Sequence, residues 1–214
     1  MFFEPPSADE EAARPPKPGL PGWYAPPAGE MGVAWVSGLL LARSENVAIT
    51  LPTIQAFRTG CLMNVNIDLR RHALSPDEFT ALSMSVFPNM IAGARAGQLP
   101  DSLLRFGVRF ADGTKATTVG QRLDGTPPPQ GPPPGPRLSW LLGGFSQRSG
   151  DEDSGLTTIG LWLWPLPPVE IFELGVEWPA GGIELSIVAL DGSAIVAAAQ
   201  QAPPPYWPDA TQSA

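Results

Sequence analysis

The stretch Cys61–Arg70 reads CLMNVNIDLR, in which every second residue is apolar and two asparagines and an aspartate separate the last four of them. Successive side chains of a β-strand point to opposite faces of the sheet, so this segment buries one face and exposes the other to water. The same period recurs over residues 104–110, where arginines alternate with apolar residues, and over 172–178, where glutamates do. Three such segments indicate a largely β protein with a hydrophobic core.

Further apolar segments separated by turn residues extend this β pattern. We expect additional strands over residues 39–43, 47–51, 138–145, 157–164 and 183–190. Residues 161–164 are apolar on both faces, which favours a central strand that is covered on each side. The pattern predicts an all-β fold, a two-sheet antiparallel sandwich of about eight to nine strands.

Two local signals predict short helices in this sandwich. Ser75 is followed by Pro76 and, three residues on, by Glu78, which are the N-cap, N1 and N3 residues of a capped helix start. Asp191 is placed to cap a short C-terminal helix over residues 193–201.

The segment 104–118 predicts a hairpin, and the parity of its residues selects the turn. A two-residue loop would set Phe110 opposite Lys115 and place a lysine on the apolar face. A three-residue loop that ends at Gly113 in the left-handed region pairs Phe110 with Thr114 instead. Lys115 then faces solvent, so we expect the three-residue loop.

Charges on two distant segments predict how their strands pair. Arg109 faces Lys115 in the expected hairpin, an unfavourable pair that an acidic strand on the other side would relieve. Antiparallel pairing of residues 104–110 with 172–178 sets Arg105 opposite Glu177 and Arg109 opposite Glu173. We therefore expect these two strands to be neighbours in one sheet.

The 214 residues suit one large β domain with tails. Residues 1–30 are proline-rich and acidic, a composition that predicts a flexible tail, although Trp23 and Tyr24 could dock where the tail meets the domain. The sandwich is expected over residues 31–202, and a second proline-rich tail over 203–214.

Charge and composition exclude several classes of partner. The net charge is −8, and no basic patch is visible, so neither nucleic acid nor an anionic membrane is an expected partner. The start of the chain does not have the pattern of a secretory signal, and no apolar run approaches the roughly 20 residues of a membrane helix. Cys61 is the only cysteine, which excludes an internal disulfide. We expect a cytoplasmic protein.

Two strings resemble a group of small uncharacterised proteins of high-GC, actinobacterial bacteria. One is LRFGVRFADGTKAT, which starts at Leu104, and the other is LWLWPLPP, which starts at Leu161. A third short string, EWPAGGI from Glu177, accompanies them. The resemblance spans roughly residues 33–207. It implies a cytoplasmic bacterial protein and brings no known activity.

Catalytic chemistry finds little support in the chain. His72 is the only histidine, so a histidine-dependent hydrolase would need it, oriented by Asp68 or Asp77, beside Ser75 or Cys61 as the nucleophile. Ser75 is expected to cap a helix, and Cys61 lies about ten residues away along a strand. We therefore interpret His72 as a loop residue and predict no catalytic residues.

Metal and cofactor sites are not predicted either. Asp151, Glu152 and Asp153 resemble the opening of a calcium loop, but the remaining ligands of such a loop are missing. The glycine pairs 143–144 and 181–182 lack the residues that accompany a phosphate-binding loop and read as bends. We expect a solvated acidic turn, no metal and no cofactor.

The seven tryptophans suggest one possible ligand site. Trp178 continues the inward parity of its strand and is expected in the core. Trp140, Trp162 and Trp164 are open to either interpretation, as core residues or as rings on which a sugar could stack. A separate Pro-x-x-Pro spacing within residues 129–136 could dock on another protein or act only as a loop.

Two functions from different classes follow from these patterns. The first is a non-enzymatic β-sandwich that acts through contacts with an unidentified protein partner. The alternative is a carbohydrate-binding, small-ligand-binding or hydrolytic sandwich with a tryptophan-lined cleft. A cleft that joins Trp162 or Trp164 to a carboxylate would favour the alternative, whereas buried indoles and a flat apolar patch would favour the first.

Overall fold

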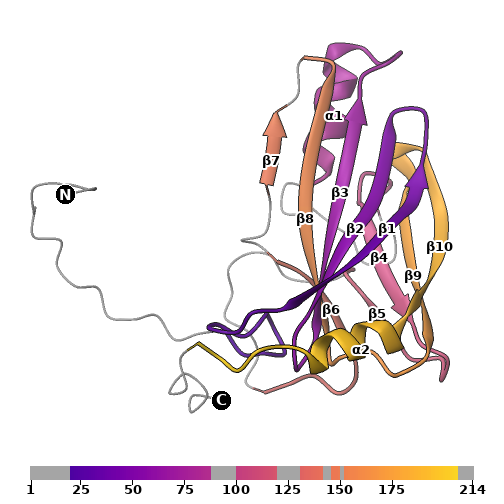
Figure 1. The fold of residues 1–214 in the computed structure, drawn as a ribbon. Helices are drawn as coiled ribbons and strands as arrows, with labels where there is room; N and C mark the ends of the chain where they lie inside the picture. The colour runs from indigo at the N-terminus through magenta and orange to yellow at the C-terminus, as the bar shows by residue number, and fades with distance from the viewer. Residues whose placement is uncertain (1–19, 88–99, 120–130, 142–145, 150–151, 207–214) are drawn as a thin grey trace, which may run out of the picture.

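A computed structural model describes residues 20–87, 100–119, 131–141, 146–149 and 152–206. These residues form two antiparallel β-sheets packed face to face, with two short α-helices at the periphery (Figure 1). The predicted two-sheet sandwich is confirmed. Ten strands are described, one more than the upper expectation, because the segment predicted as one strand near residue 140 contributes two.

Sheet A has six strands in the described residues, and sheet B has four. Sheet A has the order β1-β2-β3-β8-β6, and β7 pairs with the first half of β8, whereas β6 pairs with its last residues. Its strands are β1 (Val33–Arg43), β2 (Val47–Ala56), β3 (Cys61–Arg70), β6 (Arg137–Trp140), β7 (Ser146–Ser149) and β8 (Ser154–Trp164). Sheet B has the order β10-β9-β4-β5. Its strands are β4 (Arg105–Arg109), β5 (Lys115–Thr117), β9 (Ile171–Trp178) and β10 (Ile183–Asp191).

The alternating segments bury the faces that their parity predicts. In β3 the five apolar residues from Cys61 to Leu69 are at most 5% exposed, and in β9 Trp178 is fully buried. The inward residues of both sheets belong to one hydrophobic cluster. Where β1 and β10 lie near each other, the Ser186 hydroxyl donates to the Leu41 carbonyl oxygen over 2.6 Å. This bond ties the two sheets together at that side.

The predicted hairpin and its neighbour are confirmed in register. The Phe110 amide donates to the Thr114 carbonyl oxygen over 3.0 Å, and Gly113 has a φ of 85°. Strand β4 also pairs with β9, which sets Arg105 opposite Glu177, as the charge pattern predicts, and Arg109 opposite Glu173.

Both helices begin at the predicted caps. In α1 (Pro76–Ser85) the Ser75 hydroxyl accepts from the Glu78 amide while the Glu78 carboxylate accepts from the Ser75 amide, which completes a capping box. In α2 (Gly192–Gln200) the Asp191 carboxylate accepts from the Ser193 amide. Ile195 of α2 is fully buried and helps to close the core.

Strand β1 begins six residues earlier than expected, because two β-bulges hide its alternation. The pairing with β2 shifts between Val36 and Leu39 and again between Leu40 and Ala42. Gly38, at the first bulge, has a φ of 59°, which glycine adopts without steric cost. Each inserted residue reverses the parity of those that follow, so the segment does not read as one strand.

The strand predicted over residues 138–145 differs in its extent. Strand β6 ends at Trp140, residues 142–145 lie outside the described residues, and β7 resumes at Ser146. Both β6 and β7 pair with β8. Gly131 and Gly135, beside the Pro-x-x-Pro spacing noted in the sequence, have φ values of 104° and 94°, so a polyproline helix does not continue through either glycine.

Candidate functional site

Trp140 and Trp178 are core residues. Trp140 is 3% exposed, and its ring packs edge-on against Phe106 with 5.6 Å between the ring centroids. The indole N–H of Trp178 donates to the Ser102 carbonyl oxygen over 3.2 Å. Trp140, which the sequence leaves open, is therefore unavailable for stacking on a ligand.

Trp162 points away from the core but is also fully buried. It lies opposite Leu62, in a position where β3 and β8 face outward. Two other segments cover it: the Trp162 indole N–H donates to the Gly22 carbonyl oxygen over 3.1 Å, and the Phe57 ring packs edge-on against the indole. The predicted covering of this strand on both faces is confirmed.

The segment that covers Trp162 is held by aromatic contacts. Trp23 is 9% exposed, and the Arg137 guanidinium lies 5.6 Å from the Trp23 ring centroid and 4.8 Å from that of Tyr24. The predicted docking of Trp23 and Tyr24 is confirmed. The expected boundary of the tail at residue 30 thus falls after residues that already pack on sheet A.

Trp164 is the one candidate tryptophan that reaches a surface groove. Trp164 is half-buried and is one of the residues that line a hollow of about 390 Å³ at the end of β8. The other lining residues are Phe110, Asp112, Thr114, Gly135, Pro136, Pro165, Leu166 and Pro168. This Trp164 groove therefore has a tryptophan and an aspartate among its lining residues, one of the two features that distinguish the predicted functions.

Asp112 presents an ionised carboxylate to the Trp164 groove. Its Oδ1 atom accepts from the amide of Thr114 over 2.8 Å and from the hydroxyl of the same residue over 2.7 Å. These hydrogen bonds to the charged form lower the pKa of Asp112. Because Oδ1 is held in place, the carboxylate has a fixed orientation in the turn between β4 and β5.

A second hollow, which we call the glycine trough, crosses the outer face of sheet B. Gly107 of β4 lies opposite Gly175 of β9, so the two central strands carry no side chain at that level. Ile187 of β10 and Thr117 of β5 continue the same row at its two ends. The hollow has a volume of about 320 Å³.

Two ion pairs border the glycine trough along its sides. Arg105 Nε lies 2.8 Å from Glu177 Oε2 on one side, and Arg109 contacts Glu173 on the other. Hydrogen bonds from the two guanidinium groups lower the pKa of both carboxylates. The borders are therefore charged but internally neutralised, and most of the Arg105 side chain is buried.

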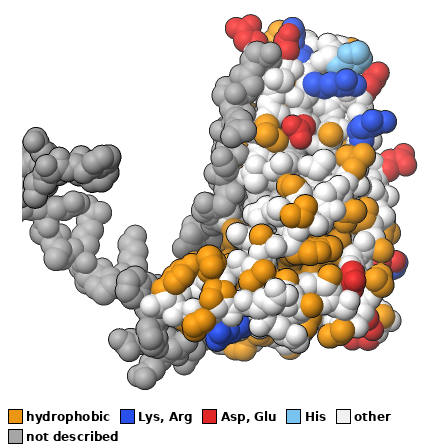
Figure 2. Space-filling model, viewed as in Figure 1, with side chains coloured by type: hydrophobic (Ala, Val, Ile, Leu, Met, Phe, Trp, Pro, Cys, Tyr) orange, Lys and Arg blue, Asp and Glu red, His pale blue; other side chains and the backbone are white. Residues whose placement is uncertain are grey.

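Aliphatic side chains are exposed at the ends of the trough. Leu185 is 62% exposed and Ile187 49% on β10, and Val119, just after β5, is 37% exposed. Exposed apolar residues beside a concave surface are typical of a contact site. A second exposed group, Met31, Val36 and Leu40, lies on or beside β1. Figure 2 shows hydrophobic side chains gathered in the lower part of one face of the molecule.

Packing does not require glycine at the floor of the trough. A Cβ atom at Gly175 would lie 3.5 Å from its nearest neighbour, and one at Gly107 would lie 3.4 Å away, which are ordinary contacts. At Gly60, by contrast, it would lie 2.5 Å from the Leu163 carbonyl oxygen. Glycine inside a strand is unfavourable relative to alanine, so this pair lowers stability with no benefit to packing.

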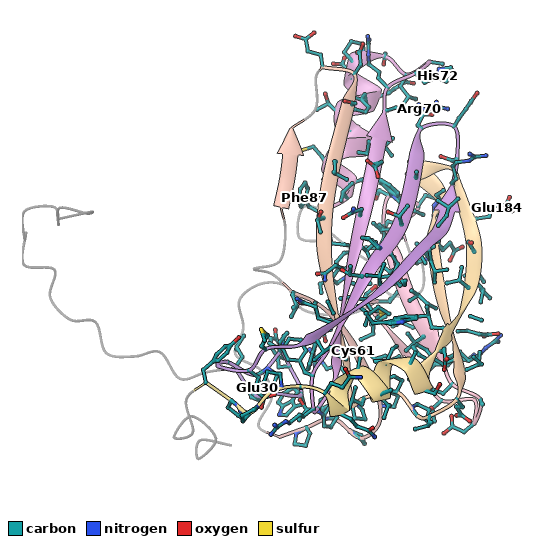
Figure 3. All side chains as sticks on the ribbon, in the orientation of Figure 1. Glu30, Cys61, Arg70, His72, Phe87 and Glu184 are labelled. Carbon is teal, nitrogen blue, oxygen red and sulfur yellow. The ribbon has the colours of Figure 1, made fainter. Side chains whose placement is uncertain are left out.

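The residues considered for hydrolysis are not brought together. Cys61 and His72 lie at opposite ends of β3 (Figure 3). Burial raises the pKa of the Cys61 thiol to about 12, which makes it a poor nucleophile. Ser75 is engaged in the helix cap, and His72 lies 3.6 Å from Glu45 on the exposed surface.

The acidic turn forms no metal site within the described residues. Asp153 makes an ion pair with Arg71, Asp151 lies outside the described residues, and no group of three potential ligands is found in the described part of the chain. The Gly181–Gly182 pair forms a bend, as predicted, with Gly182 at a φ of 68°. None of the helices described here has the length and apolar character needed to cross a membrane.

A larger hollow of about 710 Å³ lies between α1 and the turn that joins β1 to β2. Two carboxylates line it, but Glu78 is engaged in the capping box and Glu45 faces His72. The hollow therefore offers no uncommitted charged group among its lining residues. We take the Trp164 groove and the glycine trough as the two candidate sites, because each combines apolar residues with charged ones.

Comparison of the chain with protein-family models, with curated proteins and with solved structures finds no match in any of the three. The resemblance to proteins of high-GC bacteria therefore stays a prediction. The function has to be inferred from the geometry of the two candidate sites.

Proposed function

We propose that this protein is a non-enzymatic β-sandwich of the cytoplasm that acts through protein contacts, with the glycine trough of sheet B as the contact surface. The observation that carries this proposal is the Gly107–Gly175 pair, which packing does not require. Its two glycines open a hollow between exposed aliphatic side chains, where a partner's side chain can insert against the bare backbone.

The surroundings of the trough support contact with a protein. Its aliphatic ends offer apolar area, and the ion pairs at its borders offer polar groups at a rim, the arrangement common at protein interfaces. The exposed group beside β1 is less suitable, because the two bulges of this strand twist its edge and discourage strand addition. Sheet B therefore presents the better contact face.

The proposal is tested by affinity purification with matched variants. The bait is the full chain, compared with Leu185→Asp combined with Ile187→Asp, and with the control Val36→Asp combined with Leu40→Asp, which changes the other exposed aliphatic group. We expect a protein that is enriched by the wild-type and control baits, and lost from the trough variant by at least tenfold. Equal enrichment by all three baits would contradict the assignment of the trough.

A second function is favoured by the Trp164 groove, whose lining residues include both Trp164 and Asp112. A sugar or another small polar ligand could stack on the indole and hydrogen-bond to the carboxylate. Titration with a panel of mono- and oligosaccharides, followed by NMR, tests this alternative. Binding that is lost in both Trp164→Ala and Asp112→Asn would support it, and the absence of any shift would exclude these sugars.

A further inference from the structure

We propose that the partner of the glycine trough is a second copy of this chain, which packs the outer face of its sheet B against that of the first. This inference rests on the proposed function, because it names the partner of the same surface. No described segment packs over the Gly107–Gly175 pair, and the side chains around the pair make the face complementary to itself.

The outward charges of sheet B divide this face into a basic half and an acidic half. Strands β4 and β5 contribute Arg105, Arg109 and Lys115, whereas β9 contributes Glu173 and Glu177. Each glutamate lies directly opposite an arginine of β4, so the two halves meet along the line between β4 and β9. A face divided in this way attracts a second copy in which the two halves are exchanged.

Symmetry decides how the two copies are oriented. The two-fold axis of such a dimer lies in the plane of the interface, and for two aligned sheets it runs either along the strands or across them. An axis along the strands, between β4 and β9, places Arg109 of one copy opposite Glu173 of the other, and Arg105 opposite Glu177. An axis across the strands instead places Arg105 opposite Arg109 of the second copy, and the two glutamates opposite each other. Because like charges repel, the charge pattern selects the axis along the strands.

The same axis matches the aliphatic side chains at the edges of the face. Leu185 of β10 and Val119, just after β5, lie at the level of the Arg105–Glu177 pair, at opposite edges. The axis along the strands brings Leu185 of one copy against Val119 of the other. Two such contacts form, one at each edge, and both bury exposed aliphatic area. The axis across the strands would instead bring Val119 against Lys115.

The glycine trough gives ion pairs between the copies room to form. Where the axis passes between Gly107 and Gly175, neither copy has a side chain, so two hollows of about 320 Å³ face each other. Within one copy the ion pairs join Nε to Oε2, and no described residue bonds to Oε1 of Glu173 or Glu177. The half-exposed Arg109 side chain can bend over the bare backbone of the second copy and donate to a carboxylate there.

The size of the face indicates a weak dimer. Four strands about 4.8 Å apart and three rows of outward side chains about 7 Å apart cover about 400 Å² in each copy. The total lies below the range of stable complexes, about 1,200–2,000 Å². We therefore expect a reversible dimer with a dissociation constant of about 1–100 μM, which weakens as salt screens the ion pairs.

The first experiment measures the oligomeric state of the full-length chain by sedimentation velocity, at concentrations on both sides of the expected dissociation constant. Wild type should pass from monomer to dimer, and rising salt should shift it back toward monomer. Leu185→Asp combined with Ile187→Asp should weaken the dimer by about tenfold or more. The control Val36→Asp combined with Leu40→Asp should leave the dissociation constant unchanged.

An exchange of charges tests the orientation of the two copies. Arg109→Glu combined with Glu173→Arg keeps an ion pair within each copy and stays complementary to a second copy of the same variant. Its dissociation constant should remain within about threefold of wild type. A mixed dimer with wild type, by contrast, brings two arginines together and two glutamates together, so its dissociation constant should be about tenfold higher or more. Native mass spectrometry with isotope-labelled wild type measures the mixed fraction.

The matched control exchanges an exposed ion pair beside sheet A, in Arg71→Asp combined with Asp153→Arg. This variant should form mixed dimers with wild type as readily as wild type pairs with itself. Circular dichroism checks that every variant is folded.

Three results would overturn the proposal. They are a chain that stays monomeric throughout the concentration series, mixed dimers as tight as those of wild type, and a dimer that the Leu185 and Ile187 variant leaves unchanged. A monomeric chain whose trough bait still loses a different protein would reject the second copy and keep the trough as the contact surface. Equal enrichment by all three baits, together with the expected dimer, would reject the proposed function and leave the dimer standing.

Discussion

The outer faces of the two sheets carry residues of the same outward parity in very different surroundings. On sheet A, Trp162 points outward and is nevertheless fully buried, because residues 20–30 pack over it. On sheet B, the equivalent central positions are Gly107 and Gly175, and aliphatic side chains beside them are exposed. One outward face thus behaves as a second core, whereas the other is an open surface in the described part of the chain.

This difference shows that the outward residues of a sandwich need not be solvated. A tryptophan on an outer face can be covered by a segment from outside the sheet, because burying its large ring is strongly favourable. Among the described residues no segment packs over the glycine pair, and its backbone stays accessible to other molecules. The outer face of sheet A is therefore already packed, whereas the outer face of sheet B can still bury area against another molecule.

The largest expected effect concerns Trp162. Because the ring is fully buried, Trp162→Ala should lower the free energy of unfolding by about 3–5 kcal/mol, the same range as Phe106→Ala between the sheets. Urea unfolding of both variants measures this. The half-buried Trp164→Ala is the control and should lose less than half as much. A loss below about 1 kcal/mol at Trp162 would show that the outer face of sheet A is not a second core.

Glycine-to-alanine substitutions should change the free energy of unfolding differently in the two sheets. Gly60→Ala places a Cβ atom 2.6 Å from the Trp162 ring and should cost about 1–3 kcal/mol. Gly175→Ala meets only ordinary contacts and should be neutral or stabilise by up to about 1 kcal/mol. Thermal unfolding compares the two variants with wild type. A clear loss at Gly175 would mean that the trough glycines serve packing after all.

The smallest effect is a difference in pH dependence. The Arg105 guanidinium lowers the pKa of Glu177 on sheet B, so this carboxylate stabilises the fold above its ordinary pKa of 4.5, and the contribution is lost as the pH falls through the lowered value. Burial raises the pKa of Asp68 on sheet A, so its charge is unfavourable at neutral pH.

Stability measured between pH 3 and pH 7 checks both signs. At pH 7, Glu177→Gln should destabilise by no more than about 1 kcal/mol, and Asp68→Asn should stabilise slightly, as expected for groups near the surface. Both differences from wild type should shrink below the respective pKa. If both variants were stabilised, or both destabilised, at pH 7, the proposed difference between the two carboxylates would be wrong.

Much of this architecture could be predicted from local patterns. Strict alternation identified the faces of β3, β4 and β9, and the charges of Arg105 and Glu177 predicted a register that is confirmed across 72 positions of sequence. The first half of β1 was missed, because each bulge inserts a residue that breaks the period. Local patterns contain no sign of such an insertion beyond Gly38 itself.

The candidate sites were less accessible to prediction. Trp164 was predicted as one of three tryptophans, but its exposure depends on Asp112 and Pro136, which distant segments bring beside it. The burial of Trp162 depends on Gly22, 140 positions away. The trough could have been found, because once β4 is paired with β9 in the predicted register, Gly107 necessarily faces Gly175.

The pairing of β3 with β8 has a consequence for how the chain acquires its fold. Strand β3 ends at Arg70, and its partner β8 begins at Ser154, so sheet A cannot be completed until most of the chain has left the ribosome. Topologies dominated by such distant pairings fold slowly, in about milliseconds to seconds. During synthesis the edge of β3 that pairs with β8 therefore stays unpaired, and a chaperone is most useful to this protein at that stage.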